Sequence, residues 1–411
     1  MTLLPSSLSS HVPHDSSGST AGMAGMDRET AALRWADDGR HVLKNSGAYE
    51  WWYFEAISPS GDGIVFALFE GLPFHPQYLA RIHRHSHRPG ATPFDRLGPE
   101  LLAAYYPAAY IAVYQGGKRV AQSLNLFPPG SIVGEPQMPD IRIGPNRMTL
   151  RQDGTFGIIA RGYPFDIVRA QPRPSRDQVI TAKLTFAPSF PGTAHVRSFR
   201  PNGPDGAQHT WVLAAPHGRM TGNVQVIDNK EGFCRLDVRI DAVGYHDHVY
   251  GQGGLGQGLN KMLWGYLQGD NWTAAWHHSV PRSGARDHAD GLVIFEKGAL
   301  PVVLEGPSVR LEHRQLTPWF LGHPEQLAMH GSNTQGLPIE FQVHNDTIID
   351  TAPFHTRLAA TGSLNIPGYR QYVGRGSTHV MNVRRLRWPI LSDIVLMAAT
   401  PVSRDDPLWC E

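Results

Sequence analysis

The stretch YEWWYFEA, residues 49–56, decides the fold of this chain. It is dominated by aromatic side chains and contains neither glycine nor proline, which is typical of a β-strand. Successive side chains of a strand point to opposite faces. We therefore expect Glu50, Trp52 and Phe54 to share one face and the odd-numbered residues to share the other. An acidic group beside a tryptophan fits the wall of a ligand cavity or ordinary core packing with the carboxylate in solvent, because small barrels can enclose a ligand.

Short strand-like runs separated by turn residues continue along the rest of the chain. Lys183-Leu184-Thr185-Phe186 alternates polar and apolar residues, and Asp153-Gly154 is typical of a hairpin turn. The chain contains 43 glycines and 33 prolines, which suits many turns and few long helices. We therefore predict an all-β fold of two antiparallel barrels or sandwiches with few short helices.

Two domains are expected, because 411 residues are too many for one compact core. We assign residues 1–31 to a flexible polar N-terminal tail, residues 32–229 to a first barrel and residues 230–411 to a second barrel. Pro188–Gly206 is rich in proline, glycine and asparagine, so it predicts a long loop.

The charge balance excludes a typical nucleic-acid partner. Lys and Arg number 37 against 36 Asp and Glu, which gives a net charge of +1 without the basic excess of such proteins. The 2 cysteines, Cys234 and Cys410, form neither a disulfide framework nor a metal motif, which favours a reducing compartment.

Targeting features are also missing from the sequence. The first residues lack the basic start and apolar core of a signal peptide, and no apolar run is long enough to span a bilayer. We therefore expect a cytoplasmic location. Arg384–Ala399 is basic first and apolar afterwards, so it fits either a final buried element or a peripheral contact with a lipid surface. Nothing in the sequence indicates the oligomeric state.

A histidine–aspartate motif, GYHDHVYG, occupies residues 244–251. On an extended backbone His246 and His248 share one face, and Asp247 lies on the other. Two histidines on one face can chelate a metal ion, but the spacing indicates no third ligand, so we expect neither a metal nor an organic cofactor. The favoured interpretation is a proton-transfer cluster, because histidine titrates near neutral pH beside a carboxylate. The catalytic candidates are Asp247, His248, His246 and Tyr250.

A tryptophan-rich hairpin is expected at Leu263–His278, with a Gly-Asp-Asn turn between its strands. Its aromatic side chains fit the wall of an apolar pocket, and plain core packing explains them equally well. The candidate substrate-binding residues of the chain are Glu50, Trp52, Phe54, Trp264, Tyr266, Trp276 and His278.

The run RIHRHSHR, residues 81–88, is rich in histidine and arginine. An extended backbone would place His83, His85 and His87 on one face. We expect an exposed loop here, with adventitious metal binding as the second interpretation.

Three of these stretches resemble the carotenoid 1,2-hydratase (hydroxyneurosporene synthase) family and its lipocalin-like relatives. The E-W-W-Y-F pattern of that family is found at Glu50–Phe54, a pattern like G-Y-x-D-x-x-x-G at Gly244–Gly251, and a later W-G pattern at Trp264-Gly265. The chain departs from the family at Tyr250, where hydratases often carry Trp or Phe, and at Trp276–His278, where they often carry Tyr-x-Asp. The resemblance implies two tandem lipocalin-like antiparallel β-barrels.

The resemblance also implies a cofactor-independent enzyme with a hydrophobic small-molecule substrate. In the first hypothesis it is a hydro-lyase that adds water to a double bond of an isoprenoid or carotenoid-like substrate. Asp247 or His248 would protonate the double bond, and nearby tryptophan faces would stabilise the carbocation by about 0.5–2 kcal/mol each. The second hypothesis is a cyclase or pericyclase that folds a polyene. The third is a non-catalytic carrier of a lipid or pigment.

Overall fold

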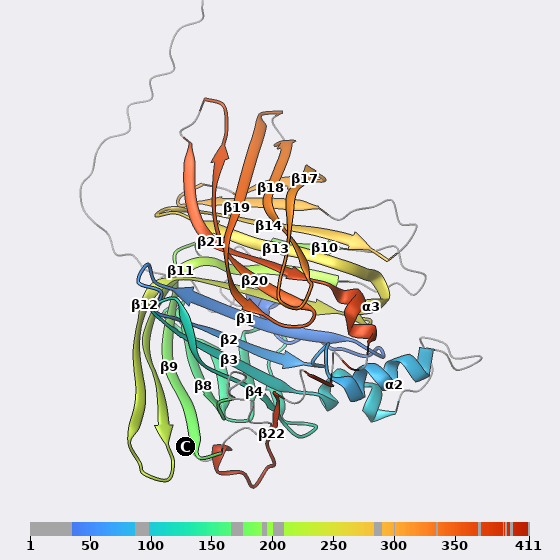
Figure 1. Ribbon diagram of the computed structural model, residues 1–411, viewed down its shortest axis with the longest axis vertical. Helices are drawn as coiled ribbons and strands as arrows, with labels where there is room; N and C mark the ends of the chain where they lie inside the picture. Colours follow the sequence, from blue (N-terminus) through green and yellow to red (C-terminus); the bar gives the residue numbers. More distant parts are fainter. Residues whose placement is uncertain are drawn as a thin grey trace, which may run out of the picture.

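The computed structural model of the protein describes residues 35–86, 98–165, 176–190, 195–199, 209–282, 290–299, 301–333, 336–368, 371–388, 390, 393–394 and 398–409. The expected N-terminal tail, residues 1–31, and His87 of the histidine-rich run lie outside these residues. Within them, most of the backbone is β-strand, arranged in two antiparallel sheets that are stacked on one another (Figure 1).

Sheet A is built from the first part of the chain and one strand near its end. Neighbouring strands follow the order β22-β4-β3-β2-β1-β12-β11-β9-β8-β7-β6-β5, and β10 pairs with β11. All pairs are antiparallel except β22 with β4. The strands are β1 (Tyr49–Ile57), β2 (Gly63–Glu70), β3 (Ala108–Gln115), β4 (Lys118–Leu126), β5 (Ile132–Gly134), β6 (Asp140–Ile143), β7 (Asn146–Leu150), β8 (Phe156–Gly162), β9 (Gln178–Pro188), β10 (His195–Phe199), β11 (His209–Asp228), β12 (Cys234–Gly251) and β22 (Thr400–Pro401).

Sheet B contains the later strands in the order β16-β15-β14-β13-β21-β20-β19-β18-β17. It lies above sheet A in Figure 1. The prediction of an all-β fold with two tandem antiparallel parts is confirmed, each part being one sheet around its own core. The strands are β13 (Leu259–Gln268), β14 (Trp272–Pro281), β15 (Gly291–Glu296), β16 (Val302–Glu305), β17 (Ser308–Leu316), β18 (Gly322–Ser332), β19 (Pro338–Thr351), β20 (His355–Asn365) and β21 (Tyr372–Met381).

Helices are short, as expected. They are α2 (Pro76–Ser86), α3 (Leu255–Gly258) and the 3₁₀ turns η1 (Ala36–Asp38), η2 (Pro99–Leu101), η3 (Ala103–Tyr105), η4 (Val383–Arg387) and η5 (Pro407–Trp409). The loop expected at residues 81–88 is wrong for its described part, which forms the end of α2 and buries Ile82. None of the helices in the described ranges has the length and apolar composition needed to span a bilayer.

The change from sheet A to sheet B comes after Gly251. Strand β12 pairs with both β1 and β11, so residues 234–251 belong to sheet A, although the division at residue 229 places them in the second unit. Residues 229–233 make a hairpin turn between two long strands, and its polar residues Asn229–Glu231 resemble a linker in sequence alone. The loop expected at Pro188–Gly206 contains β10, which pairs with β11.

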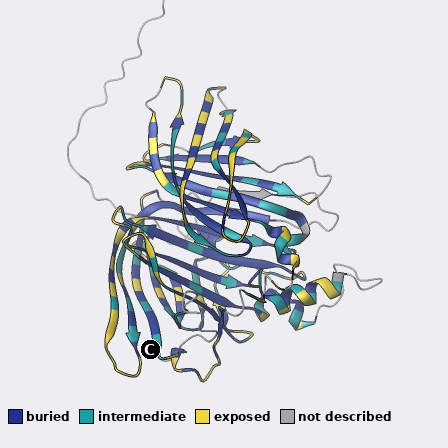
Figure 2. Cartoon of the chain, in the orientation of Figure 1, coloured by how far each residue is buried: buried dark blue, intermediate teal, exposed yellow. Residues whose placement is uncertain are grey.

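Three large groups of buried apolar side chains result from this stacking. The first lies inside sheet A and includes Trp52 and Phe54, and the second lies inside sheet B and includes Trp276. The third lies where the sheets meet and includes Trp51 and Tyr245. Figure 2 shows the resulting continuous burial along the strands at this junction. Both faces of β1 are therefore covered, one by the first core and one by sheet B.

Candidate active site between the two sheets

The even-numbered side chains of β1 and β12 point into the core of sheet A. Trp52 is paired with His248, and their rings stack with centroids 4.8 Å apart. Phe54 is paired with His246, and these rings stack at 3.8 Å. The sequence prediction that the two histidines share one face is confirmed, because the antiparallel register brings them over the aromatic residues of the neighbouring strand.

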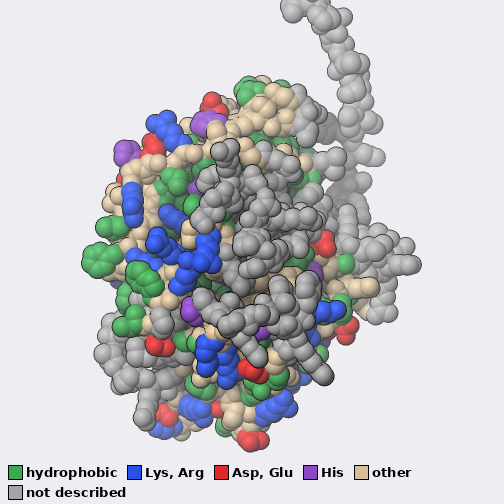
Figure 3. Space-filling view, turned by 90° about the vertical axis from the view of Figure 1, so that its right-hand side faces the viewer, with side chains coloured by type: hydrophobic (Ala, Val, Ile, Leu, Met, Phe, Trp, Pro, Cys, Tyr) green, Lys and Arg blue, Asp and Glu red, His purple; other side chains and the backbone are tan. Residues whose placement is uncertain are grey.

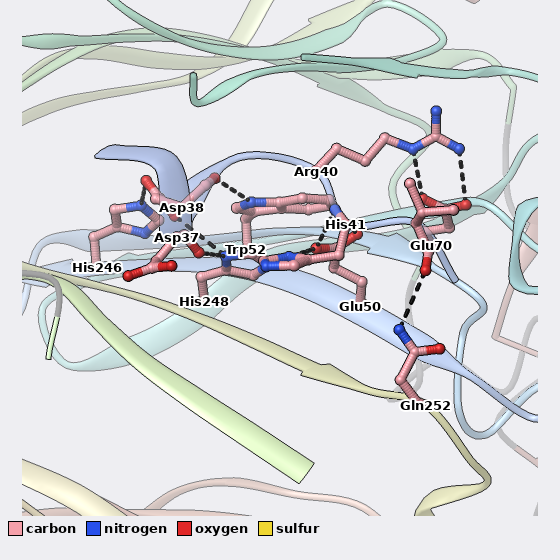
Figure 4. Close-up of polar contacts among 11 residues, drawn as sticks. Asp37, Asp38, Arg40, His41, Glu50, Trp52, Glu70, His246, His248 and Gln252 are labelled. Atoms are coloured by element: carbon pink, nitrogen blue, oxygen red, sulfur yellow. Dashed lines mark hydrogen bonds and ion pairs between the residues drawn. The ribbon is translucent and has the colours of Figure 1, made fainter. Parts of the chain in front are cut away.

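Carboxylates entering from residues 37–50 satisfy these buried histidines (Figure 4). His246 Nε2 lies 3.0 Å from Asp38 Oδ2, and His248 Nε2 lies 2.8 Å from Glu50 Oε1. The other nitrogen of His248 faces the backbone oxygen of Asp37 at 3.0 Å. Both nitrogens of the His248 ring thus face oxygen atoms, which fixes the orientation of the ring.

Glu50 is the centre of this cluster. Its Oε1 atom also lies 2.7 Å from His41 Nδ1, and its side chain is fully buried. Burial alone would raise the pKa of the Glu50 carboxyl. The hydrogen bonds from His248 and His41, together with their charges, lower the pKa by more than burial raises it, so the pKa lies below its usual value. The donor atoms of His41, Glu50 and His248 lie within 4.8 Å of one another and are of the types that bind zinc. Tyr250 stacks on the His41 ring at 3.7 Å.

Asp247 points to the opposite side, toward sheet B. Its Oδ2 atom accepts hydrogen bonds from Trp211 Nε1 and from the Tyr245 hydroxyl, each at 2.8 Å. Burial raises the pKa of this carboxyl, although the two donors act in the opposite direction. Asp247 is paired with Tyr53, so the two side chains share the face that meets sheet B. Asp247 and His248 therefore belong to two separate interiors.

A cavity of about 450 Å³ lies between the sheets, on the Tyr53 side of β1. Its apolar wall includes Trp51 and Phe69 from sheet A and Trp264 from sheet B. Pockets of this size, largely apolar with a few polar groups, are the usual sites for small apolar ligands. The cavity is therefore the candidate binding site of the described chain.

Two histidines of sheet B form part of the polar wall of this cavity. His355 Nε2 lies 3.2 Å from His379 Nδ1, and both residues line the cavity. The His379 ring stacks on Trp264 with centroids 4.8 Å apart. Its Nε2 atom lies 3.3 Å from the Ser377 hydroxyl and 3.7 Å from a carboxylate oxygen of Glu55. Burial lowers the pKa of His355 to about 3, so this ring is neutral near pH 7.

A buried ion network ties the polar wall to sheet A. Arg357 in β20 lies 2.9 Å from Glu55 of β1 and 2.6 Å from Asp350 of β19. Arg119 of β4 also lies 2.6 Å from Asp350. Although burial alone raises the pKa of Glu55, Arg357 and His379 lower it to about 2. Glu55 and Asp350 are therefore charged at neutral pH, and they hold the two sheets together across the cavity wall.

Among the sequence candidates for substrate binding, only Trp264 lines the cavity as described. Glu50, Trp52 and Phe54 face the core of sheet A, on the opposite side of β1. Tyr266 lies at the sheet junction, stacked on Tyr245 at 4.2 Å. The remaining candidates are packed in sheet B, Trp276 in its core and His278 against Asp290 at 2.7 Å.

Sequence reasoning missed His355, His379, Asp350, Arg357 and Tyr53. The alternation of β1 predicted that Tyr53 shares a face with Trp51, but both faces are equally aromatic. The best signal for the others was an arginine in the otherwise uncharged strand β20, because a charged residue in such a strand needs a partner. That signal does not identify the partner of Arg357, which is Glu55, 302 positions earlier in the chain.

The chain is similar to proteins that are already known. No protein-family model matches the chain. A curated relative from Chlorobaculum tepidum, named hydroxyneurosporene dehydrogenase, is 24% identical over 365 residues, which cover 84% of this chain and 86% of that protein. The chain is therefore similar to this relative along most of the length of both proteins.

One solved structure shares the fold of this chain. An AttH-type protein from Nitrosomonas europaea superposes with a TM-score of 0.52 at 13% identity, covering 85% of this chain and 95% of that one. Kievitone hydratase from Nectria haematococca gives a TM-score of 0.45 at 10% identity, covering 82% and 89%.

Proposed function

We propose that this protein adds water to a carbon–carbon double bond of an apolar isoprenoid or polyene. The observation that carries the proposal is the apolar cavity between the sheets, with the hydrogen-bonded pair His355 and His379 in its wall. The reaction needs only a proton, a water molecule and a dry surface. These are functions that two imidazoles and a set of aromatic rings can supply.

The substrate class follows from the size and lining of the cavity. A volume of about 450 Å³ accommodates one end of a long polyene rather than a whole carotenoid, so the reactive double bond is expected near the end of the chain. The curated relative is named for hydroxyneurosporene, which is neurosporene plus one molecule of water. An acyclic carotenoid is therefore the first compound to test.

The proposed first step is protonation of the alkene by His379. Its Nδ1 atom contacts His355, and its Nε2 atom lies near the Ser377 hydroxyl and the Glu55 carboxylate. A positive charge on the ring would therefore face the carboxylate of Glu55. Transfer of this proton to the terminal alkene carbon leaves a neutral ring and a tertiary carbocation. The face of Trp264 can stabilise that cation by about 0.5–2 kcal/mol.

The proposed second step is capture of the cation by water. The oxygen lone pair forms the new carbon–oxygen bond, and the protonated alcohol then loses a proton to the nitrogen of His379 that gave up its proton in the first step. His355 Nε2 accepts the hydrogen bond of His379 Nδ1 at 3.2 Å and keeps the ring in position through both steps. The net change is the addition of one water molecule to one double bond.

Isotope labelling tests this proposal. The protein is incubated with neurosporene or lycopene in H₂¹⁸O, and the products are analysed by mass spectrometry. A tertiary alcohol containing ¹⁸O is expected. The His379→Gln variant should lose activity by about 100-fold or more, the usual contribution of a general acid. The exposed His330 provides the matched control, because His330→Gln changes the same residue type outside the cavity.

The same assay separates the alternatives. Asp247→Asn tests a buried carboxyl whose pKa is raised by burial, and a larger loss there than in His379→Gln would transfer the acid role to Asp247. A product isomeric with the substrate and free of ¹⁸O would show a cyclase instead. A polyene that co-purifies and is never altered would show a carrier.

A further inference from the structure

Exposed apolar side chains gather beside the cavity, in the turn after β17 and in the segment after η4. Phe320 is 76% exposed, and large side chains rarely remain so open without a partner. Its backbone has a positive φ of 55°, which is costly for a non-glycine residue. We call the following set the aromatic patch: Leu316, Trp319, Phe320, Trp388 and Ile390.

Arg385 holds the two parts of the aromatic patch together. One guanidinium nitrogen donates to the backbone oxygens of Trp319 at 2.8 Å and Pro353 at 2.7 Å. The other donates to the backbone oxygen of Phe320 at 2.7 Å. The exposed turn is therefore fixed against η4, and its side chains are presented by a supported backbone.

Three arginines lie next to this patch. Arg384 and Arg387 belong to η4, and Arg387 donates to the backbone oxygen of Gly256 at 2.8 Å, two positions from Gly258, whose oxygen accepts from the backbone nitrogen of Arg282. Burial and the charges of Arg282 and Arg384 lower the pKa of Arg387. In the described ranges none of the three forms an ion pair. Figure 3 shows the face of the molecule on the side of α3, where Lys and Arg side chains gather next to protruding hydrophobic ones.

The patch also borders the cavity. Trp319, Pro353 and Phe354 belong to the cavity wall, and the same Trp319 is part of the patch. The patch and the cavity therefore adjoin at Trp319.

We propose that the aromatic patch and its arginines dock the protein onto an anionic lipid bilayer, with the cavity opening toward the lipid. Exposed aromatic side chains beside uncompensated arginines match the two components of such a surface, the acyl region and the anionic headgroups. A second copy of the chain is a poorer occupant. A twofold contact places the same patch on both sides, so the arginines of each copy would face those of the other. The inference rests on the proposed function only for the nature of the transferred molecule.

Vesicle sedimentation without any substrate tests the docking. Purified protein is mixed with vesicles of phosphatidylcholine, either alone or with phosphatidylglycerol. We expect clear binding to the anionic vesicles, weakened by salt. Arg384→Gln/Arg387→Gln should weaken that binding by about 25-fold, at roughly fivefold for each arginine near an anionic surface. Arg219→Gln/Arg239→Gln removes the same charge from sheet A and should leave binding unchanged.

A second variant tests the apolar part of the surface. Phe320→Ser/Ile390→Ser alters the two most exposed members of the patch, which do not line the cavity, and should reduce binding at least tenfold. The exposed Phe233 lies on the β11–β12 turn, so Phe233→Ser is the matched control. Circular dichroism confirms that each variant is folded.

The outcomes are distinct from those of the hydration assay. Equal binding to neutral and anionic vesicles, or no binding to either, would overturn the docking proposal. A dimer of the wild type that Phe320→Ser/Ile390→Ser dissociates in analytical ultracentrifugation would also overturn it, because the patch would then join two copies. If docking fails while ¹⁸O incorporation persists, only the membrane surface is refuted.

Discussion

Replacing Arg357 by methionine should remove the cation that joins the two sheets at the cavity wall. The pKa of Glu55 is lowered from 4.5 to about 2 in the folded chain. At about 1.4 kcal/mol for each tenfold change in acid dissociation, the charged form of Glu55 contributes about 3 kcal/mol to the free energy of unfolding. Breaking a buried ion pair typically costs about 3–5 kcal/mol, so Arg357→Met should lose this amount at pH 7.

The sign of the pH dependence provides the sharper test. A carboxyl with a lowered pKa stabilises the fold above pH 4.5, and this contribution is lost as the pH falls toward 2. Between pH 7 and pH 3 the wild type should therefore lose about 2 kcal/mol through Glu55. Arg357→Met removes the largest of the interactions that lower the pKa of Glu55, while His379 and Tyr53 still act on it, so the pKa rises and the variant loses less stability in acid than the wild type. The difference between the two proteins should therefore shrink by up to about 2 kcal/mol.

Urea denaturation followed by tryptophan fluorescence at several pH values measures this difference. Arg147 forms an exposed ion pair with Asp140, so Arg147→Met is the control and should cost at most about 1 kcal/mol at every pH. A stability difference for Arg357→Met that is the same at pH 7 and pH 3 would refute the reasoning.

Other substitutions test separate parts of the molecule. Glu50→Gln breaks the buried cluster inside sheet A and should cost about 3–5 kcal/mol in urea denaturation; a loss below about 1 kcal/mol would contradict the ionic description of that cluster. Trp264→Ala should weaken binding of a fluorescent polyene in titrations while leaving the melting temperature nearly unchanged, whereas Trp276→Ala, in the core of sheet B, should cost about 3–5 kcal/mol. Gly265→Ala should lower the melting temperature strongly, because a Cβ atom there would lie 2.3 Å from a backbone oxygen; Gly256→Ala, with 3.9 Å of space, should melt like the wild type.

The sequence predicts the strand content of this protein better than its site, and β1 shows why. Alternation places Trp52 and Phe54 on one face and Trp51 and Tyr53 on the other, as the structure has them. The choice between the faces depends on where sheet B packs, and no property of residues 49–56 encodes this. Both faces of the strand are buried, so hydrophobicity could not identify the one that lines the cavity.

The polar residues of the cavity present a different difficulty. His355 and Arg357 lie two positions apart in β20, and His379 lies in the stretch Gly374–Pro389, which looks similar to the carotenoid 1,2-hydratase family, but none of them belongs to a run of several titratable residues such as GYHDHVYG. The histidines of the GYHDHVYG motif are only two positions apart, so the motif predicts a proton-transfer cluster. In the structure those histidines lie in the core of sheet A. Contacts such as Glu55 with Arg357 arise from the stacking of two sheets, which local sequence patterns do not record.

The parallel pairing of β22 with β4 has a consequence for synthesis of the chain on the ribosome. Strand β4 lies near residue 120, whereas its outer neighbour is made only at residues 400 and 401. All of sheet B is translated in the interval, so the edge of the first sheet remains open while the second one forms. We expect nascent chains released before residue 400 to expose this edge and to aggregate. Sheet A, which is mostly made early in translation, is therefore completed only when residues 400 and 401 have been added.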